Sequence, residues 1–310
     1  MAKFKKIIPP AILFVAAMLW GFAFSAQDAA SNVPPFTLGA SRSLLASVFL
    51  LALIPIFDKA KKSERRLFSK RGIDFNRFEL IGGTICGVVL AVASFFQQTG
   101  INQGTNAGKA AFITALYVVL VPIYALALKK HSPFRVWVSV AIAVVGFYFL
   151  CIDGEFNIDL SDVYVLLCAI VFPVQILAID KYTDRCDAVR MSAIQFISAT
   201  VVNAILALAL ETPLAFDEVG NAIGAVVFLG IVSSGIAYTM QIIGQKGTNP
   251  AVASIIMSLE SVFGVIGSAI FLKQTLTTRE FIGAAIVFVA VILSELDVKA
   301  LIKKNKKASE

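Results

Sequence analysis

SFFQQTGINQGTNAGKAAFITAL, residues 94–116, has a second copy later in this chain of 310 residues. At a constant offset of 143 residues it aligns without a gap to AYTMQIIGQKGTNPAVASIIMSL, residues 237–259, and seven of the 23 positions are identical. Each copy contains a Gly-Thr-Asn turn between two apolar runs, and Asn106 or Asn249 is expected to cap the helix that follows. Self-similarity at one fixed spacing indicates an internal duplication.

The composition is strongly apolar. Hydrophobic residues make up 58% of the chain and charged residues only 15%, against about 25% charged residues in an ordinary globular domain. This excludes a soluble enzyme, a disordered chain and a nucleic-acid-binding protein. Ten apolar runs of about 20 residues can each cross ~30 Å of hydrocarbon as a helix. We therefore expect an all-α integral membrane protein with ten transmembrane helices, at 7–27, 36–57, 79–99, 107–128, 134–152, 161–180, 191–211, 221–243, 249–272 and 279–296.

The charged residues predict the orientation. Of the 27 Lys and Arg residues, 23 lie in the N-terminal segment, the C-terminal segment and every second loop, which the positive-inside rule assigns to the cytoplasm. The net charge of +7 therefore records topology, aided by anionic lipid headgroups, and needs no nucleic-acid partner. We expect a multi-pass protein of the plasma (bacterial inner) membrane, with both termini in the cytoplasm.

The offset places the third to fifth runs on the eighth to tenth, so each repeat contains five helices. Because five is odd, the second repeat must enter the membrane upside down. The first repeat is expected over 7–152 and the second over 161–296, with 297–310 as a basic cytoplasmic tail. Inverted five-helix repeats around a central cavity are typical of alternating-access transporters. The alternative is an old duplication that is retained only for packing.

Three ionisable residues lie inside the expected spans and are candidates for function. Glu260 is eleven residues past Asn249, or ~16 Å along a helix, which is close to the midplane. It could bind a substrate amine, carry a coupling proton or form a structural pair with Arg42. Arg42 is a candidate charge partner or carboxylate site, and Lys109 either extends to the membrane surface or attracts anions at an outer gate.

Polar and aromatic residues on matching faces are candidates for the substrate site. Small residues at helical spacing on the same faces are more typical of close helix packing. Tyr117 is the repeat equivalent of Glu260, and Trp20 and Gln175 lie on the first and sixth helices, where Pro173 could introduce a kink. With Glu260, the expected substrate-binding residues are Trp20, Gln98, Thr114, Tyr117, Gln175, Tyr238, Gln241 and Met257.

An enzyme finds little support. The only histidine, His131, lies in a basic loop, and the chain has no GxSxG, HExxH, P-loop or GxGxxG motif. The four cysteines form no CxxC pair and are expected to be reduced packing residues. We expect no cofactor and no metal.

The chain resembles an EamA-type member of the drug/metabolite transporter superfamily over 7–296. The resemblance rests on Leu19-Trp20-Gly21, Gln98-x-Gly100, the run from Gly104 to Thr114, Val121-Pro122 and Ser258-Leu259-Glu260-Ser261-Val262. It implies two EamA repeats, ten helices around a central cavity, and export of amino acids or other small metabolites.

These observations lead to the expectation of a secondary active transporter. It would export amino acids or similar small metabolites by alternating access, driven by protons or by the membrane potential, as a monomer or dimer. The alternative is a flippase or accessory subunit for an anionic lipid-linked metabolite, for which Arg42 and Lys109 could bind the anionic head.

Overall fold

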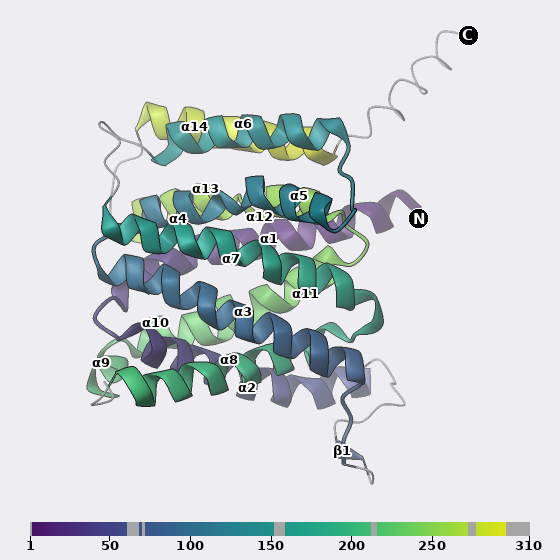
Figure 1. The fold of residues 1–310 in the computed structure, drawn as a ribbon, viewed down its shortest axis with the longest axis vertical. Helices are drawn as coiled ribbons and strands as arrows, with labels where there is room; N and C mark the ends of the chain where they lie inside the picture. Colours follow the sequence, from purple (N-terminus) through teal and green to yellow (C-terminus); the bar gives the residue numbers. More distant parts are fainter. Residues whose placement is uncertain are drawn as a thin grey trace.

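The computed structural model describes residues 2–60, 68–69, 72–151, 159–211, 216–271 and 277–295. Nearly all of them are helical, and the helices lie roughly parallel or antiparallel to one another (Figure 1). Two two-residue strands, β1 (Phe68–Ser69) and β2 (Gly72–Ile73), pair between the second and third helices. The expected tail at 297–310 lies outside the described residues.

Each expected span contains a helix or a set of consecutive helices. The helices of the first half are α1 (Ala2–Ala29), α2 (Pro35–Ala60), α3 (Arg77–Asn102), α4 (Ala107–Ala115), α5 (Tyr117–Ala127) and α6 (Phe134–Cys151). Those of the second half are α7 (Leu160–Tyr182), η1 (Thr183–Arg185), α8 (Ala188–Leu210), α9 (Phe216–Asn221), α10 (Ile223–Val227), η2 (Phe228–Ala237), α11 (Tyr238–Gln245), α12 (Pro250–Met257), α13 (Glu260–Phe271) and α14 (Thr278–Glu295). The fourth, eighth and ninth spans are therefore divided into shorter helices.

Eight of these spans are long and apolar enough to cross a bilayer. The other two are the shorter apolar helix Phe134–Leu150 and α14, which contains Arg279, Glu280 and Glu295. The protein is an all-α membrane protein, and ten passes remain consistent with its helices.

The packing relates the two halves by a pseudo-twofold exchange. Helix α3 packs on α7, and its counterparts η2 and α11 pack on α1; α7 packs on α4 and α5, and α1 packs on α12 and α13. Two pairs join equivalent helices directly: α2 with α8, and α6 with α14. Figure 1 shows these two pairs at opposite edges of the molecule, with α1 and α7 between them.

The Gly-Thr-Asn turns have the same local structure in both halves. Gly104 and Gly247 have positive φ angles of 112° and 75°, which glycine adopts without steric cost. The side chain of Asn106 accepts a hydrogen bond from the Lys109 amide, and that of Asn249 accepts one from the Ala251 amide. The predicted capping role of both asparagines is confirmed.

Close packing explains several of the glycines. A Cβ atom at Gly87 would lie 2.2 Å from the Gln195 carbonyl oxygen of α8, and one at Gly83 would lie 2.6 Å from the Ile194 side chain. The expectation that these glycines let helices approach closely is confirmed.

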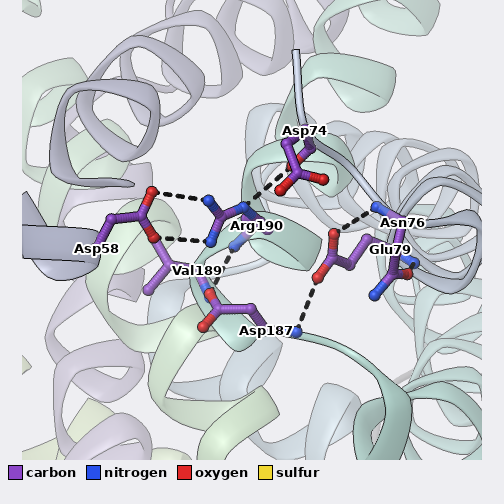
Figure 2. Close-up of polar contacts among 7 residues, drawn as sticks. All are labelled: Asp58, Asp74, Asn76, Glu79, Asp187, Val189 and Arg190. Atoms are coloured by element: carbon purple, nitrogen blue, oxygen red, sulfur yellow. Dashed lines mark hydrogen bonds and ion pairs between the residues drawn. The ribbon is translucent and has the colours of Figure 1, made fainter. Parts of the chain in front are cut away.

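An ion pair joins α2 to α8 at the end of the bundle where α3 begins, which we call the Arg190 end (Figure 2). The Arg190 guanidinium donates to both carboxylate oxygens of Asp58, at 2.9 and 2.8 Å, and to the carbonyl of Asp74. Both side chains are nearly fully buried. Nearby, the Glu79 carboxylate accepts from the amides of Asn76 and Asp187.

A carboxylate also joins the same two helices at their other end, the Glu211 end. Glu211 follows α8, and its oxygens accept from the backbone amides of Phe36 and Thr37, at 2.8 and 2.7 Å, in the first turn of α2. These amides have no partner within the helix, so the carboxylate caps it. The α2–α8 pair is thus tied at both ends.

Removing one partner of the buried ion pair should destabilise the protein strongly. Asp58→Ala leaves Arg190 buried without its counter-charge and should lower the free energy of unfolding by about 3–5 kcal/mol. Denaturant unfolding in detergent micelles measures this loss. The double substitution Asp58→Leu with Arg190→Met removes both charges and should recover most of the stability; a double variant as unstable as the single one would contradict this account.

Candidate functional site

A cavity lies between the two halves, lined by side chains of α1, α2, α3, α4, α5, α7, η2, α11, α12 and α13. It has about 510 Å³ of space between its lining atoms, within the range of small-molecule sites. Its lining residues are Trp20, Ala23, Phe24, Gln27, Arg42, Ser94, Gln97, Thr114, Tyr117, Phe172, Gln175, Ile176, Ser233, Tyr238, Gln241, Met257 and Glu260.

Two helix breaks lie at repeat-equivalent positions beside the cavity. The first, at Leu116, separates α4 from α5, and the second, at Ser258-Leu259, separates α12 from α13. At each break the chain tightens: the amide of Leu116 donates to the carbonyl of Ile113, and that of Leu259 to the carbonyl of Ile256, both at 3.2 Å. These three-residue spacings satisfy the backbone where the α-helix is interrupted.

The residue after each break faces the cavity. Tyr117 begins α5 and Glu260 begins α13, and the Tyr117 hydroxyl hydrogen-bonds the Glu260 carboxyl. Only 6% of Glu260 is exposed, and its Oε1 atom has no hydrogen-bond partner among the described residues. A buried carboxyl oxygen without a partner leaves a strong acceptor available to a ligand or a water molecule.

Arg42 provides the positive group of the cavity. Its Nε donates to the Ser234 hydroxyl at 3.1 Å and its Nη2 to the Ser233 hydroxyl at 3.3 Å. Only 8% of the residue is exposed, and none of the ion pairs between described residues includes it. Arg42 and Glu260 therefore place opposite charges on one cavity without forming an ion pair with each other.

Amide side chains form two hydrogen-bonded groups in the wall. Gln27 donates to Gln97 at 2.8 Å, and Gln97 donates to the Thr114 hydroxyl at 3.0 Å. Gln175 and Gln241 donate to each other, at 3.2 and 3.1 Å. Such groups hold their neighbours in fixed orientations and offer their remaining hydrogen-bonding atoms to a solute.

An aromatic cluster forms another part of the wall, beside a widened helix. Trp20 lies against Tyr238 with ring centroids 4.7 Å apart, and its indole N–H donates to the Ser233 carbonyl at 3.2 Å. Ser233 lies in η2, a ten-residue π-helical segment. Long π-helical segments are rare and frequently occur at functional sites.

Eight of the nine expected substrate-binding residues line this cavity, and Gln98 does not. The Gln98 amide donates instead to the Gln27 carbonyl and to the Asn102 side chain. Arg42 also lines the cavity, whereas Lys109 forms an ion pair with the buried Asp162 at the Glu211 end of the bundle. Lys109 is therefore a charge partner in this structure.

Sequence reasoning missed several lining residues, among them Gln27, Gln97, Phe172, Ser94 and Ser233. Phe172 had a signal, because it is the repeat equivalent of Trp20. Gln97 was passed over since the identity between the repeats falls on Gln98 and Gln241. The serine pair at 233–234 had no signal, because a π-helix does not follow the periodicity of an α-helix.

Within the described part of the chain, no three His, Cys, Asp or Glu residues come together as a metal site. The described thiols, Cys86, Cys168 and Cys186, are free.

The hydroxyl of Thr114 should contribute measurably to stability. Thr114→Val removes the acceptor of the buried Gln97 amide at nearly constant volume and should lower the free energy of unfolding by about 1–3 kcal/mol. Thr114→Ser keeps the hydroxyl and is the matched control, expected to lose clearly less. Equal losses in the two variants, measured by thermal unfolding in detergent, would refute a role for this hydrogen bond.

Comparisons with known proteins agree with this architecture. The sequence model of the EamA-like transporter family matches residues 9–152 and 159–296. An uncharacterized transporter of Archaeoglobus fulgidus is 29% identical over 292 residues, covering 92% of this chain and 85% of that protein. Another, from Methanothermobacter thermautotrophicus, is 21% identical over 278 residues, covering 85% and 78%. A solved crystal structure shares the fold, with a TM-score of 0.75, 18% identity, and coverage of 94% of this chain and 98% of that one.

Proposed function

This chain belongs to the EamA-like transporter family, and from that premise we propose that it exports amino acids or similarly small zwitterionic metabolites by alternating access. As a member of this family it is a multi-pass membrane transporter and not an enzyme. The direction of transport, the solute and the driving force are the proposed part.

The observation that carries the proposal is the pair of opposite charges on one cavity. Glu260 and Arg42 both line it, and neither forms an ion pair with a described residue. A zwitterion supplies an ammonium group for Glu260 and a carboxylate for Arg42, and so satisfies both buried groups at once. The aromatic rings of Trp20, Tyr117 and Tyr238 provide an apolar surface for the rest of the solute.

Glu260 also fits the role of the coupling group. A carboxyl group that is buried in the membrane is costly to keep charged and unpaired, so it takes up a proton when no cation faces it. Binding of an ammonium group and binding of a proton then exclude each other. This exclusion couples export of the solute to entry of a proton.

The flippase alternative has less support. It required both Arg42 and Lys109 to bind an anionic lipid head, and Lys109 is already paired with Asp162.

Transport in proteoliposomes tests the function. Efflux or uptake of neutral amino acids should be driven by a pH gradient, and Glu260→Gln should abolish that drive because an amide cannot take up the proton. The methyl ester and the deaminated acid of the same amino acid should compete poorly, since each lacks one of the two charges. If no solute on a broad panel moves with or without a gradient, the transporter proposal fails; if Glu260→Gln retains pH-driven transport, proton coupling through Glu260 fails.

The predicted orientation can be tested by cysteine labelling in intact cells of a bacterial host, on a background without the four native cysteines. The matched pair is His131→Cys and Gln103→Cys, which lie in exposed turns at the Arg190 end and the Glu211 end. A membrane-impermeant maleimide should label Gln103→Cys in intact cells, and His131→Cys only after permeabilisation. The reverse pattern would place both termini outside the cell.

A further inference from the structure

The positive charge of Arg42 has no counter-charge among the described residues. The ion pairs in this part of the chain are Lys109–Asp162, Lys130–Asp180 and Arg190–Asp58. The carboxyl of Glu260 faces the same cavity, yet its hydrogen bond goes to Tyr117. Serine hydroxyls orient the guanidinium of Arg42 but do not neutralise it, and a bare charge at this depth in a membrane is costly.

A second, smaller hollow lies directly beside Arg42, among α2, α3, α8 and η2. It has about 230 Å³ of space between its lining atoms, less than half the figure for the central cavity and below the usual range of small-molecule sites. Arg42 and Ser94 line both spaces. The lining residues of the hollow are Gly39, Arg42, Ser43, Leu90, Ala91, Ser94, Phe196, Ala199, Asn203 and Ser234.

The hollow offers hydrogen-bond donors and contains no acidic side chain. Ser43 is 5% exposed, and neither its hydroxyl nor that of Ser94 hydrogen-bonds another described residue. Ser234 accepts from Arg42 and retains its own O–H group for donation. One guanidinium surrounded by three available hydroxyl groups is a set that favours an anion.

We propose that this hollow, bounded by Arg42, Ser43, Ser94 and Ser234, binds a small monovalent inorganic anion such as chloride, which neutralises Arg42 when the central cavity is empty. We call it the anion pocket. Its size selects an ion over a metabolite, and its donors replace part of the ion's hydration shell. The anion pocket rests on the proposed function in one respect only: a solute carboxylate in the central cavity would compete with the anion for Arg42.

Thermal unfolding of the purified full chain in detergent tests the pocket. Sodium chloride is titrated against sodium gluconate at constant ionic strength, so that only the size of the anion changes. Chloride should raise the melting temperature in a saturable way, because a ligand that binds only the folded state stabilises it, and gluconate should not. Equal melting temperatures in the two salts would overturn the proposal.

Variants locate the effect. Arg42→Gln should lose the dependence on chloride. Ser43→Ala should weaken the apparent chloride affinity by roughly tenfold or more, because it removes a hydrogen bond to a charged group. Ser41→Ala is the matched control: it lies on the same helix, its hydroxyl donates to the Thr37 carbonyl, and chloride should bind it as it binds the unaltered protein. A Ser43→Ala variant that keeps the full chloride response would also overturn the proposal, even if Arg42→Gln fails to fold.

A second measurement uses the tryptophan beside the pocket. Trp20 donates to the carbonyl of Ser233, whose hydroxyl binds Arg42, and Trp137 is the other tryptophan of the chain. In a Trp137→Phe background, iodide should quench Trp20 fluorescence saturably, and added chloride should reverse the quenching. Purely linear quenching that chloride leaves unchanged would count against the pocket. Neither measurement needs a transported solute, so a protein that binds chloride but moves no amino acid would refute the proposed function and leave the anion pocket standing.

Discussion

Hydrocarbon offers no hydrogen bonds, so every backbone N–H and C=O group in the membrane must find its partner within the protein. This constraint produces the all-helical fold, and it also determines where the helices can deviate. At Leu116 and at Ser258-Leu259 the chain is satisfied by three-residue spacings, and in η2 the Ser233 carbonyl receives the indole N–H of Trp20. The deviations surround the cavity, because only protein or enclosed water can satisfy irregular backbone at this depth.

The same constraint separates the buried charges into two groups. Asp58 and Arg190, and Lys109 and Asp162, are paired at the ends of the helices, where their contacts tie neighbouring helices together. Arg42 and Glu260 lie at the cavity and have no charged partner among the described residues. Paired charges near the ends fit a structural role, and unpaired charges at the centre need ligands. This difference is the physical reason to assign the solute, the proton and the anion to the second group.

The sequence predicted the larger features because they depend on period and composition. The apolar runs indicated the spans, and the offset of 143 residues related Tyr117 to Glu260, which the structure brings into contact. Finer features depend on tertiary contacts. Gln98 matched its repeat equivalent, yet Asn102 and the Gln27 carbonyl hold its amide outside the cavity, while Gln97 lines it. The partner of Lys109 is 53 residues away in the sequence, and no local pattern connects them.

The contact between Tyr117 and Glu260 has a consequence for how such a chain can evolve. Two separate copies of one repeat, assembled as an antiparallel homodimer, would carry the same residue on both sides of the twofold axis. A glutamate there would face a second glutamate, and like charges in close contact within the membrane repel strongly. A tyrosine there would face a tyrosine, and the site would lack an acid. Only after the two copies are joined in one gene can one half acquire the carboxyl group while the other supplies the hydroxyl that it binds.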